Sequence, residues 1–203
     1  MKRKTLDIIL TSAGGVLTVV LIAAGALLLW GSNFTSNEVH NQLAMQDVYF
    51  PTAAQLAHPT GSEVRATMVP YLKPYAGQEV LTGTQARAYA THFIAVHLSH
   101  MPYGGVYSKV SSAARAAKPG SPQAAQLSGL ETTVFQGTTL RAMLLEAYGF
   151  SVFGMLAFDG ALAALSAALL MLVLTGLGLW HVRKTPLEEE FPKARSTETA
   201  KAA

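Results

Sequence analysis

Two long runs of apolar residues constrain this chain more than any other feature of its sequence. Residues 8–30 read IILTSAGGVLTVVLIAAGALLLW without a charged side chain, and residues 160–180 are equally uncharged. A helix rises about 1.5 Å per residue, so about 20 residues cross the hydrocarbon core of a bilayer. Each run is therefore long enough to cross a membrane once.

A cleaved signal peptide is the alternative interpretation of the first run. The apolar region of a signal peptide typically spans about 7–15 residues and ends at a small-residue cleavage site. The first run is longer and ends in LLLWGSN, which is a poor cleavage site. We therefore expect an uncleaved membrane anchor.

Basic residues flank both runs on the sides that face the chain ends. The sequence KRK precedes the first run and HVRK follows the second, so the positive-inside rule places both ends in the cytoplasm. We predict a two-pass protein of the cell membrane that contacts the lipid bilayer. Its expected parts are a cytoplasmic N-terminus at 1–7, transmembrane helices at 8–30 and 157–181, an extracytoplasmic domain at 31–156 and a disordered cytoplasmic tail at 182–203.

The segment between the runs is predicted to fold as a small helical domain. Thr82 and Gln85 form a capping-box pattern at the start of a helix that reaches Met101. This helix has little purely polar face, so we expect it to form the core of the domain. Residues 57–83 contain three prolines and are expected to be mostly loop. Other helices are predicted over residues 36–47, 107–117, 123–135 and 138–180.

The predicted fold class is mainly α, with two transmembrane helices flanking a small helical extracytoplasmic domain. The chain has no cysteine, which excludes disulfides, thiolate metal sites and cysteine nucleophiles. No basic stripe with interleaved aromatic residues is present, so nucleic-acid binding is not expected.

Three histidines on the predicted core helix are the only cluster with chemical character. His97 and His100 are three residues apart on one helix face, a spacing that can chelate a metal ion. His92 lies about 12 Å along the helix axis from His100, too far to share one ion. A metal site at His97 and His100, a pH-sensing role and a purely structural role remain open, and no cofactor is expected.

Residues near and within the second run indicate helix packing. Gly160, Ala164 and Ala168 repeat at four-residue intervals, a spacing that lets helices approach closely. Asp159 is a charge at the expected membrane mouth. The aromatic residues before it are expected to pack into the domain or onto a partner: Tyr148, Phe150, Phe153 and Phe158.

Three segments carry a resemblance to a known family: EVHNQLAMQDVYFP (38–51), YAGQEVLTGTQARAYATHFIAVHL (75–98) and FQGTTLRAMLLEAYGF (135–150). They resemble uncharacterised two-pass membrane proteins of actinobacteria, some of which carry the label of aromatic ring-opening dioxygenases. A non-haem iron dioxygenase needs a set of histidine and carboxylate ligands, and this sequence offers no such set. The resemblance therefore implies the topology and a bacterial origin but no activity.

These observations predict a non-enzymatic accessory or scaffold subunit of a larger bacterial membrane complex. Its expected partners are other integral membrane subunits or further copies of itself. Two alternatives stay open: an extracytoplasmic sensor that binds a metal or another ligand, and a self-assembling homo-oligomer.

Overall fold

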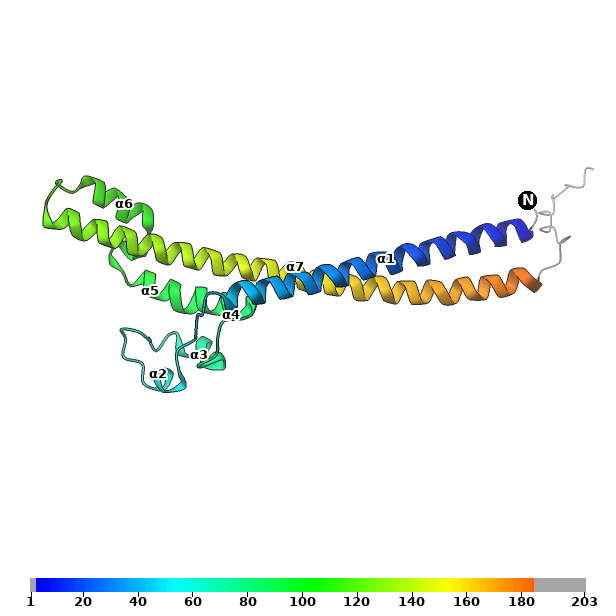
Figure 1. Cartoon of the computed structure of the whole chain (residues 1–203), viewed down its shortest axis with the longest axis horizontal. Helices are drawn as coiled ribbons and strands as arrows, with labels where there is room; N and C mark the ends of the chain where they lie inside the picture. The colour runs from blue at the N-terminus through cyan, green and yellow to red at the C-terminus, as the bar shows by residue number, and fades with distance from the viewer. Residues whose placement is uncertain (1–2, 185–203) are drawn as a thin grey trace, which may run out of the picture. The chain divides into compact units, whose positions relative to one another are not determined.

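The computed structural model describes residues 3–184, and these residues are mainly α-helical. Two helices dominate: α1 spans Arg3–Ala44 and α7 spans Pro122–Lys184 (Figure 1). A mainly helical chain with two long apolar helices confirms the predicted fold class at that level. The predicted tail falls largely on residues 185–203, which lie outside the described residues.

Both long helices contain a stretch that is long and apolar enough to cross a membrane. The predicted spans, residues 8–30 and 157–181, lie within α1 and α7. Only 17% of the most apolar stretch of α1 and 6% of that of α7 is buried within the chain. The apolar side chains of these helices therefore face outward, as they would toward lipid.

The chain divides into two compact units. The two-helix unit combines α1 up to Trp30 with α7 from Phe158 onward, and the middle unit comprises Gly31–Ala157. Both long helices contribute to both units. Each unit has its own packing.

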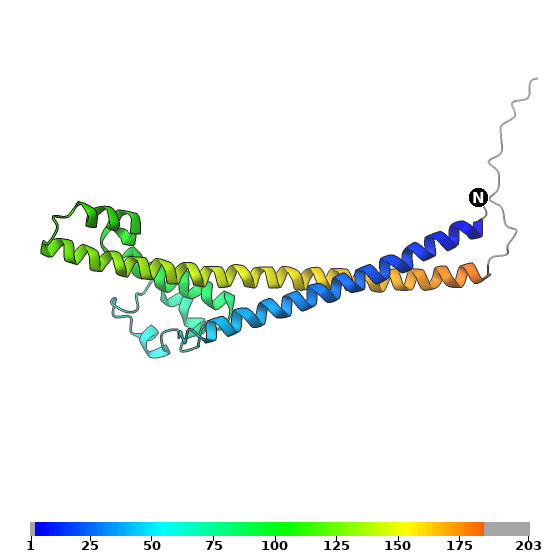
Figure 2. The same cartoon turned by 45° about the horizontal axis from the view of Figure 1, so that its top comes forward.

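In the two-helix unit, α1 and α7 lie side by side in two views (Figures 1 and 2). Ala161 and Ala168 of α7 are buried, and Thr18 of α1 is 4% exposed. A methyl group on Gly25 would come within 2.7 Å of Leu165, so the helices approach closely at this glycine. Small residues permit this approach, as in membrane helix pairs.

The middle unit contains several short helices between the ends of α1 and α7. α1 ends at Ala44, and Asp47 then adopts a left-handed conformation with φ of 50° that turns the chain. The short elements are α2 (Ala53–Ala57), α3 (Val69–Leu72), η1 (Lys73–Tyr75), α4 (Gly83–Tyr89), η2 (Ala90–Ile94), α5 (Ala95–Ser99), η3 (Pro102–Gly105) and α6 (Tyr107–Ala116).

The predicted start of the 82–101 helix is confirmed. The Thr82 side chain accepts a hydrogen bond from the Gln85 amide, and the Gln85 side chain accepts from the Thr82 amide. The helix continues to Ser99 through α4, η2 and α5, of which η2 is a π-helical turn. Shortly before Pro51, Tyr49 forms an isolated antiparallel bridge with Glu79.

The 82–101 helix contributes to the core of the middle unit, but several of the largest fully buried side chains come from the irregular segment before it. Met68, Leu72 and Val80 come from the segment expected to be mostly loop, and all three are fully buried. The 82–101 helix contributes buried Ala86 and Ala90 to this cluster, and five of its partly buried residues pack against the cluster: Ala88, Tyr89, Phe93, Ile94 and Val96. Tyr89, Phe93 and Ile94 of this helix are only half-buried and line a groove, whereas Leu98 is buried.

The predicted break between helices 123–135 and 138–180 is absent, because α7 is one helix from Pro122 to Lys184. Glycine costs a helix about 1 kcal/mol relative to alanine, which a long helix tolerates. Gly137 lies where an added methyl group would come within 2.8 Å of the Leu98 side chain. This glycine therefore serves close packing against α5 and does not end the helix.

We expect Gly105→Ala to destabilise the middle unit strongly. Gly105 has φ of +62°, and an added methyl group would clash with the backbone carbonyl of Leu98. The strain and the clash together should cost about 3 kcal/mol. Thermal loss of the helical circular dichroism signal in detergent measures the effect.

Gly104→Ala is the matched control for this variant. Gly104 has nearly the same φ of +66°, but no atom lies within 4 Å of an added methyl group. Gly104→Ala should lose only about 1 kcal/mol of stability, because it adds backbone strain but no clash. Equal losses for the two variants would contradict the close approach at Gly105.

Candidate functional site

A groove of about 770 Å³ lies in the middle unit. Its three walls are the last turns of α1, the continuous helix α4–η2–α5, and the portion of α7 from Thr133 to Phe150. Most of its lining side chains are apolar. Ligand sites in proteins typically have volumes of about 300–1,000 Å³, so the groove is large enough to hold a ligand or part of a partner.

The wall formed by α4–η2–α5 is a ladder of rings. Tyr89 packs on Phe93 with ring centroids 4.7 Å apart, and Phe93 packs on His97 at 4.5 Å. Phe50 fixes the start of the ladder by an edge-to-face contact with Tyr89 at 5.4 Å. Burial raises the pKa of the Tyr89 phenol. The wall is therefore held in place from the core side.

A π-helical turn lies in the middle of this ladder. Residues Ala90–Ile94 form it, and Phe93 and Ile94 from this turn line the groove. A π turn inserts one extra residue into a helix and is often found at functional sites. The hydrophobic pattern over 82–101 does not reveal this insertion, because periodicity alone cannot distinguish one extra residue from a broad apolar face.

The three histidines have different surroundings. His97 lines the groove and its Nδ1 donates to the Phe93 carbonyl at 2.8 Å, whereas exposed His100 donates from Nδ1 to the Val96 carbonyl at 2.8 Å. His92 stacks on Tyr71 with ring centroids 3.7 Å apart. Among residues 3–184, no three His, Cys, Asp or Glu side chains are grouped so that they could hold a metal ion. Because both Nδ1 atoms are hydrogen-bonded to backbone carbonyls, only the Nε2 atoms of His97 and His100 remain available to bind a metal ion.

The charged side chains that line the groove are both acidic. Glu38 comes from α1 and Glu146 from α7, and neither lysine nor arginine contributes to the lining. Gln42 donates to the Glu38 carboxylate at 2.7 Å, which orients it beside the groove. Further negative charge lies near the end of α1. The carboxylates of Glu79 and then Asp47 raise the pKa of exposed Tyr49.

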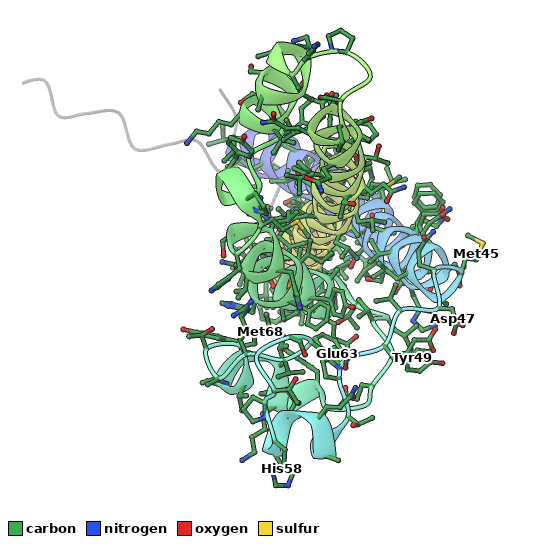
Figure 3. The ribbon with its side chains drawn as sticks, turned by 90° about the vertical axis from the view of Figure 1, so that its left-hand side faces the viewer. Met45, Asp47, Tyr49, His58, Glu63 and Met68 are labelled. Atoms are coloured by element: carbon green, nitrogen blue, oxygen red, sulfur yellow. The ribbon has the colours of Figure 1, made fainter. Side chains whose placement is uncertain are left out.

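Figure 3 shows Met45, Asp47 and Tyr49 gathered on one side of the middle unit, just beyond the last turn of α1. Met45 and Tyr49 are 69% and 53% exposed. An apolar and acidic surface therefore adjoins the groove.

The residues predicted to pack helices fall in several places. Ala168 is buried in the two-helix unit, Ala164 is half-buried, and a methyl group on Gly160 would touch Leu28 at 3.4 Å. Fully buried Ala161 was missed. Ala161 and Ala168 are seven residues apart, so a search for heptad spacing in place of four-residue spacing would have found this face.

The predicted aromatic residues mostly remain uncovered by the chain itself. Tyr148 is the exception: its hydroxyl accepts a hydrogen bond from Arg87 at 2.9 Å, and the same guanidinium lies 4.9 Å from its ring centre. Phe150, Phe153 and Phe158 are each more than half exposed. Asp159 is exposed on α7 as well.

Sequence reasoning missed the groove residues Leu140 and Met143. They are 53% and 63% exposed although both are apolar. The available signal was their spacing to Ala147 and Phe150, which alternates between three and four residues. That spacing is visible in the sequence, but only the end of α1 at Ala44 shows that this face is left open.

Comparison with known proteins gives no match: neither a protein-family model, nor a curated protein, nor a solved structure is significantly similar to this chain. The resemblance to two-pass actinobacterial membrane proteins therefore stays a prediction.

We expect His92 to make the middle unit less stable in mild acid. Burial, and then the nearby Arg87 charge, lower the pKa of His92 below 6.5. The unfolded chain therefore binds the proton more readily, so the His92 contribution is complete above pH 6.5 and declines as the pH falls toward the folded pKa. Unfolding midpoints between pH 7.5 and 5 measure this decline.

The His92→Phe variant keeps a ring on Tyr71 but cannot be protonated, so its midpoint should fall less over this pH range. Tyr71→Ala removes the ring that covers His92 and should also weaken the pH dependence. An unchanged pH dependence in His92→Phe would refute the assignment.

Proposed function

We propose that this chain is a two-pass membrane protein that serves as a non-enzymatic accessory subunit of a larger membrane complex. Both termini lie in the cytoplasm, and the middle unit lies on the opposite side of the membrane. One observation supports this proposal above all. In the middle unit, apolar side chains of α7 are exposed because no other part of the described chain covers them.

The lengths and flanks of α1 and α7 support two crossings. Each contains an apolar stretch longer than the roughly 20 residues that a bilayer requires. Trp30 and Trp180 close the two uncharged runs, and Lys184 lies 3.9 Å from the ring centre of Trp180. Tryptophan with a neighbouring cation is typical of a membrane interface, and cations collect on the cytoplasmic side.

Because the chain has no cysteine, single introduced cysteines can report on which side each region lies. We expect Ser62→Cys, at an exposed loop of the middle unit, to react with a membrane-impermeant maleimide in intact cells. Ser196→Cys, in the C-terminal sequence, should react only after the membrane is opened. The readout is the mass shift of the labelled protein.

The cysteine-free wild type is the control for nonspecific labelling. Labelling of Ser196→Cys in intact cells, or protection of Ser62→Cys, would contradict the proposed orientation.

The partner role is supported by apolar surface that the chain does not cover. α7 has 63 residues, about three times the number needed for one crossing. In the middle unit its exposed apolar side chains include Leu140, Met143 and Phe150. Soluble surfaces rarely keep such contiguous apolar patches, which mark sites of interaction with proteins or membranes.

The size of the protein in mild detergent tests this role. We expect the chain extracted from its native membrane to migrate as a complex that contains at least one other integral membrane protein. Blue native electrophoresis, followed by mass spectrometry of the excised band, provides the measurement.

The same sample after transfer to a harsh detergent should migrate as one chain and thus serves as the control. Migration as a single chain in mild detergent would contradict the proposal. A complex built of this chain alone would replace it with the homo-oligomer alternative.

A further inference from the structure

We propose that the groove of the middle unit binds a basic, amphipathic helix of the partner subunit, laid along α7. This inference rests on the proposed function, because it names the partner's chemistry and the place where it binds. Four observations carry it: the spacing of apolar residues on α7, the place where α1 ends, the length of the open face and the charge of its rim.

The α7 wall presents one face in coiled-coil register. Six of its nine lining residues recur at intervals of three and four: Thr133, Gln136, Leu140, Met143, Ala147 and Phe150. Residues with this spacing lie along one stripe of a helix, which is the stripe that packs against another helix. The wall is therefore shaped as one half of a helix–helix interface.

Where this stripe of α7 continues beyond Phe150, α1 covers it. Gly154 follows Phe150 in the repeat, and a methyl group on Gly154 would touch Thr35 of α1 at 3.4 Å. α1 continues with buried Val39 and Leu43 and then ends at Ala44. Beyond that point the stripe loses its cover, so the groove continues an interface that the chain itself begins.

The length of the open stripe favours a helix over a small molecule. From Thr133 to Phe150 the stripe extends about 26 Å along the helix axis. Met143 and Phe150 are 63% and 53% exposed, so the groove is open along this length. A helix placed in such a groove anchors side chains at positions i, i+3 or i+4, and i+7.

The charge of the rim selects a basic helix. Glu38 and Glu146 are the only charged residues among those that line the groove. Asp47 and Glu79 add negative charge nearby, as the raised pKa of Tyr49 reflects. Complementary charge at an interface rim guides the partner and excludes helices of the opposite charge.

Two synthetic helical peptides test the proposal on the full-length protein in phosphatidylcholine nanodiscs. Both are roughly 18 residues long, to match the stripe, with leucine at alternating three- and four-residue spacing. One carries lysine and arginine beside the leucine stripe, and its twin carries glutamate. Fluorescence anisotropy measures binding, and empty nanodiscs provide the background.

We expect the basic peptide to bind at least about tenfold more tightly than its acidic twin. Met143→Glu places a charge in the open stripe and should weaken binding of the basic peptide at least about tenfold, as at an interface hot spot. Ala142→Glu is the matched control, because Ala142 is exposed on the same helix but outside the groove. It should change binding by less than about twofold.

The double variant Glu38→Lys/Glu146→Lys should reverse the preference and favour the acidic twin. Equal binding of the two peptides, or equal effects of Met143→Glu and Ala142→Glu, would overturn the proposal. A second copy of the chain in the groove, or a co-purified apolar small molecule that Met143→Glu releases, would overturn it as well. Native mass spectrometry distinguishes these two occupants.

Failure of this inference can be separated from failure of the proposed function. Blue native electrophoresis of Met143→Glu from native membranes shows whether the complex persists. If the wild type forms a complex that Met143→Glu leaves intact, the accessory role stands and the groove is not its contact. If the wild type forms no complex, the proposed function itself fails.

Discussion

Apolar side chains must be covered, and this requirement explains how α1 and α7 are arranged. α1 and α7 carry large apolar residues on most sides, and the chain buries only a small share of them. In water such helices would be unstable as exposed rods, because their apolar area has no favourable environment. Lipid covers such surface in the proposed arrangement, and small residues cover the narrow strip where the two helices touch. Thr18, Gly25 and Ala161 belong to that strip.

A difference in helix length creates the candidate site. α1 ends at Ala44, whereas the apolar stripe of α7 continues away from Gly154 toward Thr133. The 82–101 helix supplies a wall beside the open stripe, and its ring ladder gives that wall a fixed form. The groove is therefore the place where one helix of a pair has stopped and the other has not. The charged side chains at its rim are acidic, and the proposed basic helix would complement them.

Several features could be predicted from sequence because they depend on local chemistry. The two apolar runs predicted two long helices, and Thr82 with Gln85 predicted the start of α4. The same kind of reasoning wrongly predicted a break between residues 135 and 138, because α7 continues through Gly137. A glycine can either end a helix or permit a close approach, and only the position of Leu98 decides between these roles. The core role of Met68 was likewise hidden, because an irregular segment shows no periodicity.

Local sequence patterns were enough to predict a mainly helical chain with two helices apolar enough to span a membrane. Helix length, capping and hydrophobic content are set by residues close together in the chain. The tertiary structure decided which faces of those helices are covered. The sequence shows that Leu140 and Met143 are apolar. They line an open groove because α1 ends before it reaches them. Whether an apolar helix face is covered depends on segments that are distant in sequence and meet in space. The local sequence of α7 does not show where α1 ends.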